Sequence, residues 1–273
     1  MNRNIEEVEF TIFDTETTGL DPLSGDRIVE IAGIRLKGRT RLAVFQSLVN
    51  PLRPMSEGAF HVNRISSQML IDAPKMEEIL PGFLNFIHGS CLCSYNAPFD
   101  LGFLNNEFKL SGRDFPKEIV VIDILAMARR LMPNLERYAL WFVAEKLGLK
   151  KEQKHRALSD VELTLEVFNR LAEILRQKGI LKFKNFFNLF GLNLHLLEDI
   201  NNQKIAKIQE SIDLGVRLKI KYLSCADAEV SEREVIPKEI RQEKKFNYLV
   251  GFCCLRNQER TFRIDSILDL EII

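Results

Sequence analysis

Cysteines, an excess of one charge and long hydrophobic runs are all scarce or missing in this sequence. Five cysteines in 273 residues are too few, and odd in number, for a disulfide framework. They also lack the spacing of a zinc site, so we expect buried, reduced thiols. No apolar run approaches the ~20 residues that span a bilayer, and the first residues lack the pattern of a signal peptide. We therefore expect no membrane segment and a cytoplasmic location.

The balance of charge excludes one class of nucleic-acid-binding protein. Lysine plus arginine and aspartate plus glutamate both number 38, so the formal net charge is zero. A protein that coats duplex DNA carries a basic excess, so any contact of this chain with nucleic acid must be local. The hydrophobic content of 46% is ordinary for a folded protein, and the length suffices for one large or two medium domains.

The first two thirds of the chain show two periodicities. Short apolar runs indicate strands, and apolar residues three or four apart indicate helices. The predicted strands are 8–13, 28–36, 43–49, 91–95 and 119–122. The predicted helices are 76–87, a stretch that begins at Pro98, 124–131, 140–147 and about 158–177. Three strands followed by strands interleaved with helices predict an α/β domain with a mixed sheet.

Asp14 and Glu16 follow directly on the first apolar run. Residues i and i+2 of a strand point to the same face, so the two carboxylates project together from the end of the strand. Like charges this close repel each other unless a cation lies between them. Hard divalent ions such as Mg²⁺ and Mn²⁺ prefer oxygen ligands of this kind. The pair predicts a metal site, although a solitary D-x-E pair is also typical of a solvated strand end.

Further acidic residues and a base lie at comparable junctions. Asp100 follows the strand 91–95 at the start of a helix, and Asp160 lies where a loop enters the last long helix. Ligands of open α/β sheets gather at such strand ends. Three separated acidic segments would suit two cations ~3.5–4 Å apart, the arrangement for in-line displacement at phosphorus. His155 is expected on the loop before the helix, where an imidazole can accept a proton from an attacking water.

Together these residues resemble a known family. The segments are Asp14-Thr15-Glu16-Thr17-Thr18-Gly19, Asn96-x-x-Phe99-Asp100 and His155-Arg156-Ala157-Leu158-x-Asp160. In order and content they resemble the three motifs of the DEDDh branch of 3′→5′ exonucleases, and above all the proofreading subunits of bacterial replicative DNA polymerases. The resemblance extends over about residues 7–176. It implies a ribonuclease-H-like mixed sheet flanked by helices.

The resemblance also implies roles for particular residues. Asp14, Glu16, Asp100 and Asp160 would hold two divalent cations, Mg²⁺ or Mn²⁺, and His155 would be the general base. The residues implied to contact the substrate are Thr17, Thr18, Gly19, Val62, Asn63, Asn96 and Phe99. Two positions depart from the family pattern, because Asn63 and Tyr95 stand where relatives often have histidine. Asp123, after a predicted strand, is either a helix N-cap or a further site residue.

The remainder of the chain changes character twice. Residues 177–202 are predicted to form an apolar helical connector, and Phe186–Phe190 faintly resembles a sliding-clamp docking motif without its leading glutamine. A new helix is predicted from about Ile205 to Leu214. Closely spaced strands follow at 218–223, 233–237, 247–255, 260–264 and 267–272. Short strands with polar turns predict a small Sm/SH3-like β-barrel over residues 203–273.

This last segment resembles a WYL domain. The residues that carry the resemblance are Ile220-Lys221-Tyr222, Arg233-Glu234-Val235-Ile236-Pro237, Asn247-Tyr248-Leu249-Val250-Gly251 and Arg260-Thr261-Phe262-Arg263-Ile264-Asp265-Ser266-Ile267. Asn247 replaces the usual tryptophan and Ser266 a common arginine. The resemblance implies a nucleic-acid or nucleotide ligand on one face, and the residues expected to contact it are Tyr222, Arg233, Tyr248, Arg260 and Arg263. The alternative is that these side chains are ordinary half-buried or solvated residues.

The function expected from the sequence is a metal-dependent 3′→5′ exonuclease. It would hydrolyse the terminal phosphodiester of single-stranded or frayed DNA and release nucleoside 5′-monophosphates, in DNA repair or replication proofreading. A DNA polymerase or a sliding clamp is a candidate protein partner, but for residues 186–190 a core helix is preferred over a clamp-docking motif. Two alternatives stay open at this point: an RNA-directed exonuclease on the same fold, because nothing in the motifs reads the 2′-hydroxyl, and a nucleic-acid or nucleotide sensor that works through the C-terminal segment.

Overall fold

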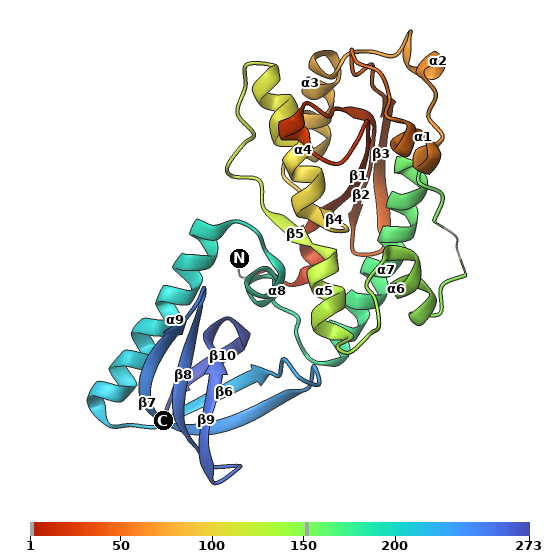
Figure 1. Ribbon diagram of the computed structural model, residues 1–273. Coiled ribbons are helices and arrows are strands. Elements are labelled where there is room, and N and C mark those ends of the chain that lie inside the picture. Colours follow the sequence, from red (N-terminus) through yellow and green to blue (C-terminus); the bar gives the residue numbers. More distant parts are fainter. Residues whose placement is uncertain (1–2, 151–152) are drawn as a thin grey trace.

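The computed structural model describes residues 3–150 and 153–273 and contains two five-stranded sheets (Figure 1). The first sheet has the order β3-β2-β1-β4-β5. Its strands are β1 (Glu9–Thr17), β2 (Ile28–Lys37), β3 (Thr40–Leu48), β4 (Cys91–Ser94) and β5 (Val121–Asp123). β1 pairs antiparallel with β2 and parallel with β4, so the sheet is mixed, as the sequence predicts.

The central strand β1 alternates between two apolar cores. Phe10 and Ile12 belong to the core on one face, where Phe10 lies 5.1 Å from Phe168 between ring centroids. Phe13 belongs to the core on the other face, beside Phe83. The first face is covered by α5 (Ile124–Leu131), α6 (Leu140–Lys146), α7 (Ala157–Gln177) and α8 (Phe183–Phe190), and the second by α3 (Met76–Ile87) and α4 (Ala97–Leu110). Asp14 and Glu16 continue the series of Phe10 and Ile12, so they lie on the α7 side.

Short elements precede and follow β1. The single turn η1 (Ile5–Glu7) comes before the strand, and the turn η2 (Pro22–Ser24) and the helices α1 (Glu57–Asn63) and α2 (Ser67–Leu70) come after its C-terminal end in the chain. The Ser56 amide donates to the Thr18 carbonyl at 3.3 Å, which ties the start of α1 to the segment after β1. This arrangement places α1 beside the sheet edge at which Glu16 lies.

The second sheet is antiparallel and open. Its order is β10-β6-β7-β8-β9, formed by β6 (Leu218–Leu223), β7 (Val230–Glu243), β8 (Phe246–Cys253), β9 (Gln258–Arg263) and β10 (Ile267–Ile272). Within the described ranges no pairing joins β9 to β10, so the expected closed barrel is not found. The turn η3 (Ile264–Ser266) separates these strands, and α9 (Leu194–Leu214) packs Ile208, which is 0% exposed, into the sheet's core. A helix therefore completes this core instead of a last strand pair.

Helix α9 also changes the expected organisation of the connector. The prediction that a new helix begins near Ile205 is wrong, because α9 begins at Leu194 and runs without a break to Leu214. It crosses the predicted boundary between 177–202 and 203–273. The division into segments 7–176, 177–202 and 203–273 therefore stays a prediction.

The two sheets share buried contacts. Leu223 of β6 and Leu268 of β10 belong to the same core as Phe10 and α7. From α5, the Arg130 guanidinium donates to the Leu223 carbonyl at 2.9 Å and to Ser266 Oγ at 2.6 Å. Asn188 of α8 donates to the Asp265 carbonyl. Packing and hydrogen bonds thus join the two sheets.

Two smaller points follow from the fold. Trp141 of α6 is 42% exposed whereas its neighbour Phe142 is buried, because α6 turns the Trp141 face outward. The phenylalanines of α8 are buried among Phe10 and Phe168, which favours the core helix over a docking motif. None of the helices in 3–150 and 153–273 is both long and apolar enough to cross a membrane.

Candidate active site

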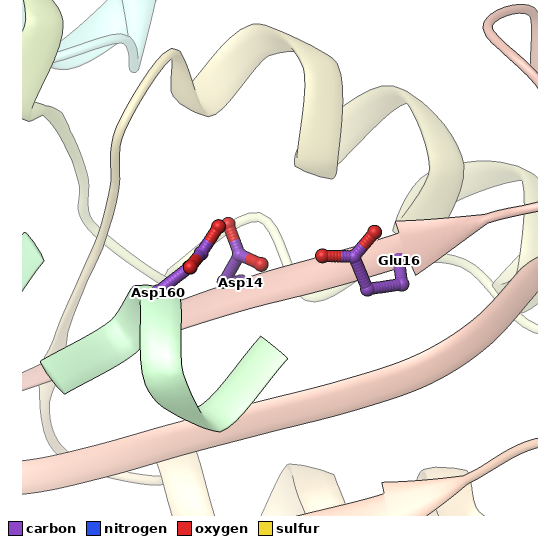
Figure 2. Close-up of side chains that lie close together, drawn as sticks. All are labelled: Asp14, Glu16 and Asp160. Atoms are coloured by element: carbon purple, nitrogen blue, oxygen red, sulfur yellow. The ribbon is translucent and has the colours of Figure 1, made fainter. Parts of the chain in front are cut away.

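Three carboxylates meet at the C-terminal end of β1. Asp14 and Glu16 come from β1, and Asp160 comes from the first turn of α7. One oxygen from each lies within 4.8 Å of the others. Figure 2 shows the three side chains pointing toward one another from the strand and the helix. Oxygen ligands from three carboxylates are the donor set that hard divalent cations prefer, so the residues fit such an ion.

The electrostatics of this cluster are unfavourable for three anions. Burial, followed by the charges of Asp160 and Glu30, raises the pKa of Glu16 to about 8. Burial and the neighbouring carboxylates also raise the pKa of Asp14 well above its ordinary value. The pKa of Asp160 is raised by burial, although hydrogen bonds from Gln153 and the Lys154 amide oppose this effect. Without a cation, the cluster therefore holds protons near neutral pH.

Asp100 lies beside the cluster but outside it. One of its oxygens accepts hydrogen bonds from the Thr15 amide at 3.0 Å and the Thr15 hydroxyl at 2.6 Å, and the other accepts one from Ser94. Thr15 faces away from Asp14 and Glu16 because side chains alternate along β1. Burial raises the pKa of Asp100 to about 6, and these hydrogen bonds hold it below the value that burial alone would give. Its charge nevertheless acts on Asp14, whose pKa it raises.

His155 stands on the loop before α7, as the sequence predicts. Its side chain is half exposed, and Nδ1 lies 4.0 Å from Asp160 Oδ2. Its backbone has φ = 51°, a left-handed conformation that few residues other than glycine adopt. The imidazole therefore stands at the rim of the carboxylate cluster, with one face open to solvent.

A fifth carboxylate at this end of the sheet was missed by the sequence reasoning. Glu30 of β2 pairs across the sheet with Glu16 and is 0% exposed. It accepts two hydrogen bonds from the Arg156 guanidinium, at 2.9 and 3.0 Å, and one from the Ala157 amide at 3.0 Å. The signal in the sequence is one acid inside the apolar run 28–36, since a buried charge requires a partner.

The segment after β1 is held by its own side chains. Thr17 Oγ1 donates to the Gly19 carbonyl at 2.6 Å, and Thr18 Oγ1 donates to Asp26 at 3.0 Å. A Cβ on Gly19 would lie 2.2 Å from an Asp26 oxygen, so any other residue would displace the Asp26 carboxylate. The two hydroxyls are therefore engaged internally, and what this turn offers to a ligand is its backbone.

The remaining residues expected to contact substrate lie on two elements. On α1, Val62 is 51% exposed, whereas Asn63 is buried and its amide lowers the pKa of Glu16, against the raising effect of burial. Asn96, exposed and in a left-handed conformation, precedes α4. Phe99 is half-buried against Phe103, with 5.0 Å between ring centroids. Val62 and Asn96 are thus open to a ligand, whereas Asn63 and Phe99 pack within the protein beside the site.

Asp123 acts as a cap. Its carboxylate accepts hydrogen bonds from the Leu125 amide at 3.1 Å and the Ala97 amide at 3.3 Å. It therefore satisfies the first turns of both α5 and α4. The N-cap interpretation is confirmed, and the cap also fixes the start of the helix that carries Asp100.

The charged residues of the second sheet are mostly paired. Arg263 forms an ion pair with Asp265 and lies 3.9 Å from the centroid of the Phe246 ring. Arg233 donates to Ser231 Oγ at 3.0 Å. Tyr222 packs edge-on against Phe262. Tyr248 is half-buried and Arg260 is exposed. The residues proposed for ligand contact thus have structural partners in several cases.

Comparison with protein families assigns the first sheet. A family model described as "Exonuclease" matches residues 11–168, which include all three carboxylates of the cluster and His155. The chain belongs to this exonuclease family. A second model, described as "WYL domain", matches residues 203–272, the part that holds the second sheet.

Curated relatives of this exonuclease are longer proteins. It is 32% identical over 263 residues to a DNA polymerase III PolC-type of Caldanaerobacter subterraneus subsp. tengcongensis, covering 94% of this chain and 18% of that protein. It is 35% identical over 201 residues to a DNA polymerase III subunit epsilon-like protein of Rhodobacter capsulatus, covering 72% of this chain and 28% of that one. The chain thus spans less than a third of the length of these two relatives.

Solved structures share the exonuclease fold. Exonuclease X, solved in complex with 5′ overhanging duplex DNA, is 28% identical with a TM-score of 0.50, covering 62% of this chain and 93% of that one. The nuclease domain of 3′hExo, a DEDDh family member bound to rAMP, is 20% identical with a TM-score of 0.54, covering 64% of this chain and 96% of that one. The second likeness shows the fold alone.

Proposed function

We propose that this exonuclease removes nucleotides from the 3′ ends of single-stranded or frayed DNA and releases nucleoside 5′-monophosphates. The observation that carries the proposal is the cluster of Asp14, Glu16 and Asp160, whose oxygens lie within 4.8 Å of one another at the sheet edge. The pKa values of all three carboxylates are raised, so the cluster lowers the stability of the folded protein near neutral pH. Such a cluster is typical of a site that binds a cation.

The chemistry follows from the donor set and from His155. Two divalent cations, Mg²⁺ or Mn²⁺, would supply Lewis-acid stabilisation of charge at phosphorus. Asp14, Glu16 and Asp160 would hold them together with Asp100, whose charge already acts on Asp14. His155, half exposed at the rim, would accept the proton of the attacking water. The backbone of Thr17–Gly19, together with Val62 and Asn96, would line the seat of the terminal nucleotide.

The choice of DNA rests on the comparisons. Two curated relatives are named as DNA polymerase III proteins, and the structure of Exonuclease X contains duplex DNA. An unpaired 3′ end fits a reaction in which the last nucleotide must reach buried carboxylates. A polymerase partner and a role in proofreading or repair, in the cytoplasm, remain our expectation on the same grounds. For the second sheet, a nucleic-acid or nucleotide ligand stays a hypothesis.

The test uses 5′-labelled single-stranded DNA and RNA oligomers of one sequence. Each is incubated with the full chain and Mg²⁺, Mn²⁺ or EDTA, and Asp14→Asn serves as the inactive control. We expect a ladder that shortens from the 3′ end with metal and no change with EDTA. Shortening of neither oligomer would refute the exonuclease proposal, and faster cleavage of RNA than of DNA would refute the choice of substrate.

A further inference from the structure

Glu30 is a buried anion that the proposed chemistry does not use. It lies on β2 opposite Glu16 and accepts hydrogen bonds from Arg156, from the Ala157 amide and, at 3.1 Å, from Gln46. Burial alone would raise its pKa, but these hydrogen bonds lower the pKa below its ordinary value. Glu30 therefore stays charged. A further anion beside the cluster raises the pKa of Asp14 and Glu16, so the fold bears a cost for keeping it.

His155 lies between two anchored segments. Before it, the Lys154 amide donates to Asp160 Oδ1 at 3.2 Å and Gln153 donates to Asp160 Oδ2 at 2.9 Å. After it, the Arg156 side chain and the Ala157 amide bind Glu30. His155 itself has φ = 51°. A residue other than glycine keeps this conformation only when the surrounding structure holds it there.

The bonds to Glu30 supply the hold on the C-terminal side. The Arg156 fork is bidentate, which fixes the direction of the side chain as well as its position. The Ala157 amide is the first of α7, the helix that carries Asp160, so the same carboxylate fixes both the exit from His155 and the start of the helix. Glu30 thus links β2 to Arg156 and Ala157, the two residues that directly follow His155.

We infer that the Glu30–Arg156 pair is a positioning device that holds His155 at the rim of the carboxylate cluster. The inference deepens the proposed function and rests on it. Neither Glu30 nor Arg156 touches the reacting atoms in this scheme. They act through the backbone that follows His155, and their loss lets the His155 backbone relax and moves the imidazole away from Asp160.

The chain offers a matched control for a purely structural role. Glu107 of α4 is 1% exposed and binds the Arg27 guanidinium in the same bidentate manner, with both distances 2.7 Å. It also accepts a backbone hydrogen bond, from the Ile28 amide at 3.2 Å. The two pairs are alike in burial and geometry, but the Glu107 pair lies away from His155 in the chain. Glu107→Gln therefore reports the cost of breaking such a pair without releasing the imidazole.

The first experiment observes His155 without relying on activity. The full chain is prepared with ¹³C-labelled histidine, free of metal, and the imidazole resonance of His155 is assigned with His155→Ala. We expect Glu30→Gln and Arg156→Lys to shift or broaden this resonance toward that of an exposed, unrestrained histidine. Glu107→Gln should lower the melting temperature and leave the resonance in place. An unchanged His155 resonance in Glu30→Gln would overturn the inference.

The second experiment is a double-mutant cycle in the exonuclease assay. We expect Glu30→Gln to lower kcat by roughly 10–100-fold, the range found for residues that orient a functional group, with little change in KM for DNA. In the His155→Ala background the same substitution should change kcat by less than about twofold, because the group it positions is gone. An equal loss in both backgrounds would contradict the inference.

Failure of the two proposals can be told apart. A wild-type chain that shortens neither oligomer with either metal refutes the proposed function, and the His155 resonance still decides whether the pair holds the imidazole. An active chain whose Glu30→Gln variant keeps both its kcat and its His155 resonance refutes the positioning role alone. Arg156→Lys adds a further criterion, since lysine keeps the charge but cannot form the fork.

Discussion

The two sheets treat charge in opposite ways. At the edge of the first sheet, Asp14, Glu16 and Asp160 lie together, and burial with mutual repulsion raises their pKa values. On the second sheet, charged residues are placed against partners, as Arg263 is against Asp265. A charged side chain that forms an ion pair within the protein contributes to its structure. Carboxylates that repel one another are stabilised only when a cation binds between them, which is typical of a functional site. The first sheet therefore carries the stronger indication of chemistry.

The largest expected effect comes from neutralising one carboxylate of the cluster. Asp14→Asn should lower exonuclease activity by at least ~10²–10³-fold, the scale for loss of a group that stabilises charge in the transition state. The same substitution should raise the melting temperature of the metal-free protein at pH 9, because it removes a repelling carboxylate without changing the shape. Activity assays and thermal melts measure the two effects. An Asp14→Asn variant that is inactive and also less stable than the wild type would contradict the view that the carboxylates of the first sheet repel one another.

A smaller effect is expected where the two sheets meet. Arg130→Met keeps the aliphatic stem but leaves the Leu223 carbonyl and Ser266 without the guanidinium. We expect a loss of about 1.5–3 kcal/mol in the free energy of unfolding, the usual value for hydrogen bonds to a charged group. The rate of DNA cleavage per folded molecule should stay within about twofold of the wild-type rate. Urea unfolding measures the loss.

An exposed ion pair of the second sheet is the control for Arg130. Arg241 pairs with Glu239 on β7, and both side chains are about half exposed. Arg241→Met should leave the free energy of unfolding nearly unchanged, since exposed pairs contribute little. If Arg130→Met has no greater effect than this variant, the contact between the sheets is incidental.

Smaller than the effect of Arg130→Met is the expected dependence of stability on pH. The folded-state pKa of Glu16 is raised from 4.5 to about 8, so the folded protein binds more protons than the unfolded chain between these values. The stability associated with this group is complete below about pH 4.5 and is lost as the pH rises through about 8. We expect a loss on the order of 1 kcal/mol, reduced by solvent in the cleft.

Urea unfolding of the wild type and of Glu16→Gln from pH 5 to pH 9 isolates this loss. The difference between the two curves should grow as the pH rises, in favour of the variant. Saturating Mn²⁺ should remove the wild type's disadvantage, because a cation then replaces the protons. If the wild type and Glu16→Gln are equally stable at every pH, the Glu16 carboxylate is not destabilised by its neighbours.

Local patterns in the sequence predict the elements and the carboxylate cluster, but not every contact. The helices α3 and α5 and the strands β6 and β10 have the bounds that their apolar periodicity predicts. Asp14, Glu16 and Asp160 also meet as predicted, because strand alternation and helix starts are local rules. Asp100 does not join them within 4.8 Å, since its partner Thr15 faces the other side of β1.

What could not be predicted depends on tertiary pairing. Glu30 is revealed as part of the site only by its register against Glu16 and by the return of α7 from residues about 126 positions away. The open second sheet likewise depends on where α9 packs. The sequence predicts a connector that ends at residue 202 and a new helix from about Ile205, whereas α9 runs through this boundary and contributes Ile208 to the core.

The shared core has a consequence for synthesis on the ribosome. Phe10 is made long before Leu268, yet both belong to one core. At translation rates of ~5–20 residues per second, several seconds separate the synthesis of the first sheet from that of β10. During that interval part of the apolar face around Phe10 is uncovered, and it is covered once β10 has been made.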